Sequence, residues 1–227
     1  MNTRLITRYA VRETMGVLIV AVALFWSAGR LDWTPAWVVV LITAAWTIAT
    51  AAVILHTNPA LLGERLGPRK GAKSWDTAIM SLMGLLQLAR YILAGLGQRY
   101  DWNSGFPDIA QIIAILVTIA GYALFVWAIG SNAYFSQIVR LQDERGHAVA
   151  TGGPYQVVRH PAYFGTILVE LALPILLSSW WAMLPSAINV LLLILRTHLE
   201  DRSLQAELPG YSEYACQTRF RLLPGLW

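Results

Sequence analysis

Two clusters of polar residues in the last third of the chain could do chemistry. The first comprises residues 151–155 (TGGPY) and 159–165 (RHPAYFG). Pro161 is well suited to be the first residue of a helix, and the free N–H groups at a helix N-terminus suit an anionic group. Arg159 and His160 would reinforce such a site. Read more simply, the glycines form a turn and Arg159 reaches from an apolar helix toward the membrane interface.

The second cluster is residues 196–204 (RTHLEDRSL). Arg196 and Glu200 are four residues apart and so share one face of a helix. The acid could serve a cationic or polyhydroxyl ligand, and the arginine could serve an anionic acceptor. The simpler alternative is a solvated ion pair at the end of a helix.

Composition indicates a membrane protein around these clusters. Of the 227 residues, 56% are hydrophobic and 13% are charged, against about 25% charged in soluble domains. Long apolar runs predict an all-α, multi-pass transmembrane helical bundle of about six spans, at residues 13–28, 35–56, 76–97, 108–130, 161–178 and 181–197. We expect a single membrane domain over residues 1–227. Its first four spans lie in 1–130, and a polar loop, a helical hairpin and a C-terminal tail lie in 131–227. Only Ser179 and Trp180 separate the last two spans, so a tight hairpin should bring the two polar clusters together.

The distribution of positive charge predicts the orientation. Fourteen Lys and Arg residues fall in the segments on the side of the two termini, against Arg30 and Arg99 on the other side. Because Lys and Arg are retained in the cytoplasm, both termini and the two polar clusters should be cytoplasmic, and we expect the plasma (inner) membrane. An aromatic belt should mark the opposite side, formed by Trp33, Trp37, Tyr100, Trp102, Trp180 and Trp181.

Several classes of function are excluded or disfavoured. The chain has no Gly-x-Gly-x-x-Gly, no Walker phosphate loop and no Gly-x-Ser-x-Gly elbow. The four histidines lack the spacing of a helical metal pair, and a single cysteine, Cys216, rules out a disulfide framework. Basic residues are too scattered for nucleic acid. Glu170 and Arg90 lie within spans, where charge is costly, and we interpret them as a structural pair.

Three strings carry a resemblance: GGPYQVVRHPAYFG, LEDRSLQAELPGYSEYA and RFRLLPGLW. Together they resemble the isoprenylcysteine carboxyl methyltransferase family, over about residues 131–227, in a bacterial-type member. The resemblance implies an integral membrane enzyme that transfers a methyl group from S-adenosylmethionine. The acceptor would be lipophilic, a carboxylate of an isoprenylcysteine-like, prenylated or other lipid substrate that enters from the bilayer.

The resemblance also implies site residues. Arg196 would orient the methyl acceptor as the catalytic residue. The cofactor would contact Arg140, His147, Ala148, Val149, Ala150, Tyr155, His160, Pro161, Ala162, Tyr163 and Glu200. No metal is implied. Two positions depart from the family's pattern: the acidic pair is Glu200-Asp201 rather than two glutamates, and Arg140 replaces a neutral residue.

Two other readings stay open. Membrane sterol and isoprenoid reductases share an Arg-His-Pro-x-Tyr stretch and a Tyr-x-x-Tyr tail but bind NADPH. A 2′-phosphate requires extra cations, whereas the acidic Glu200-Asp201 favours a sulfonium cofactor. The third reading is a non-catalytic membrane protein that keeps the fold as a binding module.

Overall fold

The computed structural model describes residues 3–66, 71–102 and 105–227, and within these ranges the regular elements are all helical. Six helices are long: α1 (Thr3–Ala28), α2 (Thr34–Thr57), α4 (Ser74–Arg99), α5 (Asp108–Gly130), α6 (Pro161–Leu176) and α7 (Met183–Glu207). Four elements are short: α3 (Leu61–Leu66), the 3₁₀ turns Asp143–Arg145 and Gly153–Gln156, and α8 (Tyr211–Gln217). The predicted all-α bundle is confirmed.

The long helices form a closed ring. Each packs chiefly against two neighbours, in the order α1, α4, α7, α6, α5, α2 and back to α1. Five of them are long and apolar enough to cross a membrane, whereas α6 has only 16 residues, about 24 Å at 1.5 Å per residue. The chain is therefore a multi-pass membrane protein in which α6 is the short member of the ring.

Two glycines allow α5 and α6 to pack at close range. A Cβ on Gly121 would lie 2.5 Å from the carbonyl oxygen of Gly165, and a Cβ on Gly165 would lie equally close to the carbonyl of Gly121. Small residues at a crossing let helix backbones approach in membranes. This contact fixes the first turns of α6 against the bundle.

The last hairpin differs in length from the prediction. Helix α6 ends at Leu176 and α7 begins at Met183, so six residues connect them rather than two. Ser178 takes a left-handed conformation with φ of 54°, which cannot continue a right-handed helix. Helix α7 instead continues ten residues beyond its apolar span, to Glu207, and carries the second polar cluster past the bundle.

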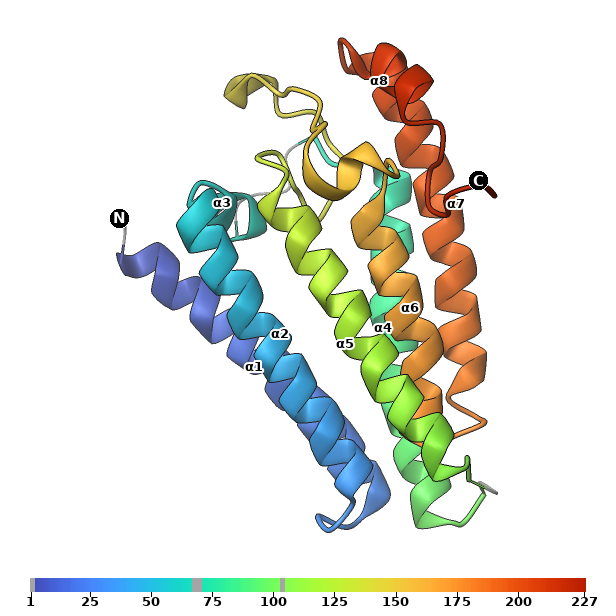
Figure 1. The fold of residues 1–227 in the computed structure, drawn as a ribbon. Helices are drawn as coiled ribbons and strands as arrows, with labels where there is room; N and C mark the ends of the chain where they lie inside the picture. The colour runs from blue at the N-terminus through green and yellow to red at the C-terminus, as the bar shows by residue number, and fades with distance from the viewer. Residues whose placement is uncertain (1–2, 67–70, 103–104) are drawn as a thin grey trace.

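Polar elements gather at one end of the bundle (Figure 1). Both termini, α3, the long connection between α5 and α6, and α8 lie at this end. The other end holds the turns with the expected aromatic belt, of which all but Trp33 are exposed; Trp33 is 5% exposed and packs in the core. Arg69 and Lys70, which the charge count includes, fall outside the described residues.

Candidate functional site

A cavity opens at the polar end, between four parts of the chain. It is lined by the α5–α6 connection, the start of α6, the end of α7 and α8. Of the twelve residues expected from the resemblance, eleven line it: Arg140, His147, Ala148, Val149, Ala150, Tyr155, His160, Ala162, Tyr163, Arg196 and Glu200. Pro161 does not line the cavity; it is buried as the first residue of α6.

The α5–α6 connection is held in shape by its own side chains. Gln142 is fully buried, donates from Nε2 to the Tyr134 carbonyl (2.7 Å) and accepts from Arg145 (2.5 Å). The Gln142 N–H donates to Nδ1 of His147 (3.3 Å), which a neutral imidazole accepts. Burial lowers the pKa of His147, in agreement with this neutral form. The loop thus presents a neutral histidine to the cavity.

Arg140 lines the cavity, but its positive charge is paired with carboxylates. Its Nη2 donates to Glu64 of α3 (2.6 Å) and to Glu144 (2.8 Å). Burial opposes the charge of Arg140, but these hydrogen bonds outweigh it and raise its pKa. Its charge is therefore already neutralised by two carboxylates.

The guanidinium of Arg159 is also paired with a carboxylate. The simpler reading, in which it reaches toward the membrane interface, is wrong: the residue is 7% exposed. Its Nε and Nη2 donate to the two oxygens of Asp201 (2.7 and 3.0 Å), and Nη1 donates to the carbonyls of Thr218 and Arg219. Although burial disfavours its charge, the Asp201 carboxylate raises the pKa of Arg159.

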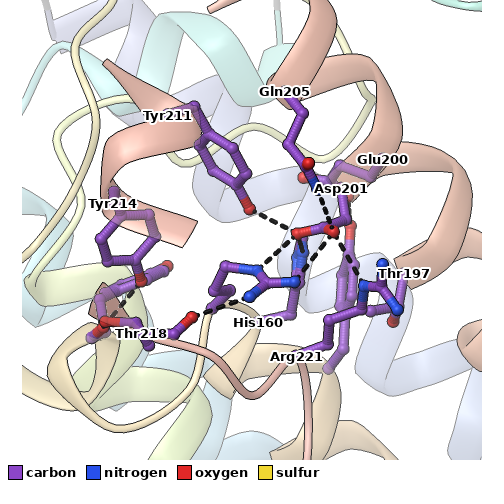
Figure 2. A network of polar contacts seen from close by, with 12 residues as sticks. His160, Thr197, Glu200, Asp201, Gln205, Tyr211, Tyr214, Thr218 and Arg221 are labelled. Atoms are coloured by element: carbon purple, nitrogen blue, oxygen red, sulfur yellow. Dashed lines mark hydrogen bonds and ion pairs between the residues drawn. The ribbon is translucent and has the colours of Figure 1, made fainter. Parts of the chain in front are cut away.

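Asp201 is the centre of a buried network (Figure 2). Its carboxylate is fully buried and accepts from Arg159, Gln205 (2.8 Å), Tyr211 (2.9 Å) and Arg221 (2.8 Å), with Nε2 of His160 at 3.4 Å. These donors come from the residues just before α6, from α7, from α8 and from the C-terminal tail. Asp201 therefore fastens the elements around the cavity to one another.

Glu200, the preceding residue, behaves differently. It is partly buried, lines the cavity, and accepts a short hydrogen bond on Oε2 from the hydroxyl of Tyr163. Among the described residues its other oxygen, Oε1, has no hydrogen-bond partner and the carboxylate has no salt bridge. The two neighbouring acids thus differ in role: Glu200 faces the cavity, whereas Asp201 holds the surrounding elements together.

Arg196 does not form the solvated ion pair with Glu200 that their spacing allows. It is 5% exposed, and its Nε and Nη2 donate to Asp76 of α4 (2.6 and 3.3 Å). Nη2 also donates to the Gln137 carbonyl (2.8 Å), and the guanidinium lies 5.0 Å from the centre of the Tyr163 ring. The four-residue spacing did not predict the partner, because the Asp76 carboxylate, 120 residues away in the sequence, binds the Arg196 guanidinium instead.

Aromatic residues complete the cavity, and sequence reasoning missed most of them. Tyr134, Tyr211 and Tyr214 line it beside the expected Tyr155. Burial raises the pKa of Tyr214 to about 12, and its hydroxyl donates to the Tyr155 carbonyl (2.7 Å). The spacing Tyr211-x-x-Tyr214 was visible in the sequence and could have indicated a helix face turned toward the site.

No group of three or more His, Cys, Asp or Glu side chains with the geometry of a metal site occurs in the described part of the chain. The arrangement suits a small organic ligand with hydroxyl and cationic groups, bound between tyrosines and apolar side chains.

Comparison with known proteins identifies the segment that builds this cavity. Residues 113–206 match the profile of the "Isoprenylcysteine carboxyl methyltransferase (ICMT) family". The match covers 94 of the 227 residues, so it is a similarity of this segment of the chain. Proteins of Oryza sativa subsp. indica and subsp. japonica, both described as "Probable protein-S-isoprenylcysteine O-methyltransferase", are each 22% identical to it over 139 residues, 59% of this chain and 70% of theirs.

The matched segment includes α6, most of α5 and α7, and the connection that lines the cavity. It ends before α8, and it excludes α3 and α4, which provide Glu64 and Asp76. The cavity lining therefore extends beyond the matched segment to α8, and two acids that precede the segment hold the lining residues Arg140 and Arg196.

Proposed function

We propose that the protein transfers a methyl group from S-adenosylmethionine to a carboxylate of a lipophilic acceptor, and that the cavity at the polar end is its active site. The observation that carries the proposal is the balance of charge in the cavity. All three arginines in its lining are paired with carboxylates: Arg140 with Glu64 and Glu144, Arg159 with Asp201, and Arg196 with Asp76. Among the described residues, Glu200 is a cavity acid without a salt bridge.

Such a cavity favours a cation. A sulfonium and an ammonium group both carry positive charge, which an unpaired carboxylate and aromatic faces attract. NADPH instead brings phosphates, which call for arginines with free donors. Because the cavity arginines already serve carboxylates, the charge balance supports S-adenosylmethionine over NADPH.

The residues present fit that cofactor. Oε1 of Glu200 could accept from a ribose hydroxyl or the ammonium group, and the tyrosine rings with Val149 and Leu204 could enclose the adenine. When bound, the cofactor supplies an electrophilic methyl group. The protein's part is to position the two reactants and to exclude water, which accounts for much of the acceleration when two reactants meet. A carboxylate acceptor needs no general base, only a cation such as Arg196 to orient it.

The acceptor enters from the bilayer in this proposal. The similar rice proteins are described as acting on isoprenylcysteine, in which a terminal carboxylate is joined to a hydrocarbon chain. That chemistry matches a cavity at the end of an apolar bundle. We propose an isoprenylcysteine-like or related lipid carboxylate as the acceptor class.

We also propose that both termini and the cavity face the cytoplasm, in the plasma (inner) membrane. The fourteen-to-two distribution of Lys and Arg supports this orientation. A reporter enzyme fused after Trp227 should be active when it requires the cytoplasm. Activity restricted to a periplasmic or luminal reporter would contradict the orientation.

The function is tested by incubating the purified protein in liposomes with S-adenosylmethionine labelled on its methyl group and an S-farnesylcysteine derivative. We expect the label to appear in the acceptor as a base-labile methyl ester, at a rate proportional to the concentration of the protein. Glu200→Gln should reduce the rate, while Glu207→Gln, at an exposed salt bridge with Lys73, should not. No label in farnesylcysteine or in extracted membrane lipids would overturn the proposal.

A further inference from the structure

The first turn of α4 supplies a carboxylate that holds both Arg196 and the cavity loop. Asp76 is fully buried. Oδ1 accepts from Nε of Arg196 (2.6 Å), and Oδ2 accepts from Nη2 (3.3 Å) and from the backbone N–H of Val139 (2.7 Å). Asp76 lies outside the segment that matches the methyltransferase family. It thus joins an element outside that segment to two residues that line the cavity.

These contacts leave one part of the guanidinium for a ligand. Nε and Nη2 of Arg196 are bound to Asp76 and to the Gln137 carbonyl, whereas Nη1 has no hydrogen-bond partner among the described residues. A guanidinium is planar and rigid, so holding two of its nitrogens fixes the direction of the third. The Tyr163 ring, 5.0 Å from the guanidinium, supports the same orientation.

The loop is held by the same turn. While Asp76 accepts from the Val139 N–H, the Lys73 N–H donates to the Val139 carbonyl (3.2 Å). Val139 lines the cavity beside Arg140. One carboxylate therefore sets the position of Arg196 relative to Val139 in the cavity loop.

We propose that Asp76 is a positioning residue for methyl transfer: it holds Arg196 so that Nη1 meets the acceptor carboxylate. The inference rests on the proposed function. Asp76 itself touches neither reactant; it acts through Arg196. Asn at this position keeps the size but removes the charge, so the guanidinium is no longer held by a bidentate ion pair.

The test compares Asp76→Asn with Glu207→Gln in liposomes. Glu207 also links α4 to α7, through Lys73 (2.7 Å), but it does not contact Arg196 or line the cavity. We expect Asp76→Asn to lower kcat for methylation of farnesylcysteine at least tenfold while the Kd for S-adenosylhomocysteine stays within threefold. Glu207→Gln should match the wild type in both. A parallel loss of affinity and kcat in Asp76→Asn would indicate general damage to the cavity and overturn the inference.

A double-variant cycle shows whether Asp76 acts through Arg196. If it does, adding Asp76→Asn to Arg196→Lys should slow turnover by no more than about twofold beyond Arg196→Lys alone, since coupled residues are not additive. Multiplied losses would overturn the inference. If Asp76→Asn does not fold, Asp76→Glu, which keeps the charge and displaces it by one methylene, is measured in the same way, with the same expected fall in kcat.

Failure of this inference differs from failure of the proposed function. A wild-type protein that neither binds S-adenosylhomocysteine nor methylates farnesylcysteine overturns both. A wild-type protein that does both, with an Asp76→Asn variant that retains the wild-type kcat, overturns only the role of Asp76.

Discussion

Two of the buried clusters of charge, Arg90–Glu170 among the membrane spans and the Asp201 network beside the cavity, differ in how completely their polar groups are paired. In the span cluster, Arg90 donates to Glu170 (2.5 Å) and Ser186 (3.3 Å), yet the buried Nε of Arg90 and Oδ1 of Asn189 have no hydrogen-bond partner among the described residues. In the cavity cluster, both oxygens of Asp201 accept several bonds.

Position along the helices explains the difference. Glu170 lies seven residues beyond Tyr163 on α6, about 10 Å deeper along the helix, away from the cavity. There, the pair links α4, α6 and α7 among apolar neighbours, as expected for a structural pair. Asp201 lies next to the cavity acid Glu200, so its bonds also set the shape of the site. The span cluster should control stability alone, and the Asp201 cluster should control both stability and binding.

The largest effect is expected in the span cluster. Glu170→Leu leaves Arg90 buried without its carboxylate, which should lower the free energy of unfolding by up to about 5 kcal/mol. Thermal unfolding in detergent measures the loss. Arg90→Leu combined with Glu170→Leu should recover much of it, because replacing a whole buried pair with apolar groups is often neutral. A double variant as unstable as Glu170→Leu would contradict the structural role of the pair.

Asp201→Asn should have the next largest effect and should separate the two clusters. Removing the charge leaves Arg159 without its main partner, at a cost of about 3 kcal/mol in stability. Because Asp201 joins the end of the α5–α6 connection, α7, α8 and the tail, affinity for S-adenosylhomocysteine should fall as well. The variant is measured by thermal unfolding and calorimetry beside Glu170→Leu, which should keep wild-type affinity under conditions in which it is folded. Equal effects on affinity from both variants would refute the division.

Glu200→Gln should affect binding alone. The variant loses a charge-assisted hydrogen bond to the cofactor, about 1.5–3 kcal/mol, whereas Asp201 and its partners are untouched. Calorimetry should show weaker S-adenosylhomocysteine binding with an unchanged unfolding temperature. Unchanged affinity in the folded variant would remove Glu200 from the binding site.

The smallest expected effect is a dependence of stability on pH through His147. Its pKa is lowered by burial, so the unfolded chain takes up the proton first, at its ordinary pKa of about 6.5. Stability from this residue is therefore full above that pH and declines as the pH falls through the lowered pKa. Unfolding temperatures between pH 7.5 and 5 should show this decline, and His147→Gln should reduce it. An identical profile in the variant would exclude His147 as the source.

Hydropathy and local motifs predicted much of this molecule. The apolar runs predicted the six long helices, and the motif strings indicated residues that surround one cavity. Hydropathy could not predict that α7 continues to Glu207, nor that α6 stops at Leu176 before the left-handed Ser178, because both depend on tertiary packing and local backbone conformation.

The partners of Arg159 and Arg196 could not be predicted from the sequence. Local spacing pairs Arg196 with Glu200, but the fold pairs it with Asp76. Nothing in the sequence marked Asp76, because acidic residues are common in the first turn of helices, where they complement the helix dipole. Arg159 and Asp201 are 42 residues apart, and nothing local distinguishes Asp201 from Glu200. Contacts between distant segments, not residue types, decide which charges are free to bind a ligand.

The central claim is that the cavity, with its arginines paired and Glu200 unpaired, selects S-adenosylmethionine chemistry over NADPH. Calorimetric titration of the purified protein with S-adenosylhomocysteine and, separately, with NADPH tests this directly. We predict binding of S-adenosylhomocysteine at a single site, weakened in Glu200→Gln, and no binding of NADPH. Binding of NADPH without S-adenosylhomocysteine, or binding of neither by the folded protein, would contradict the account.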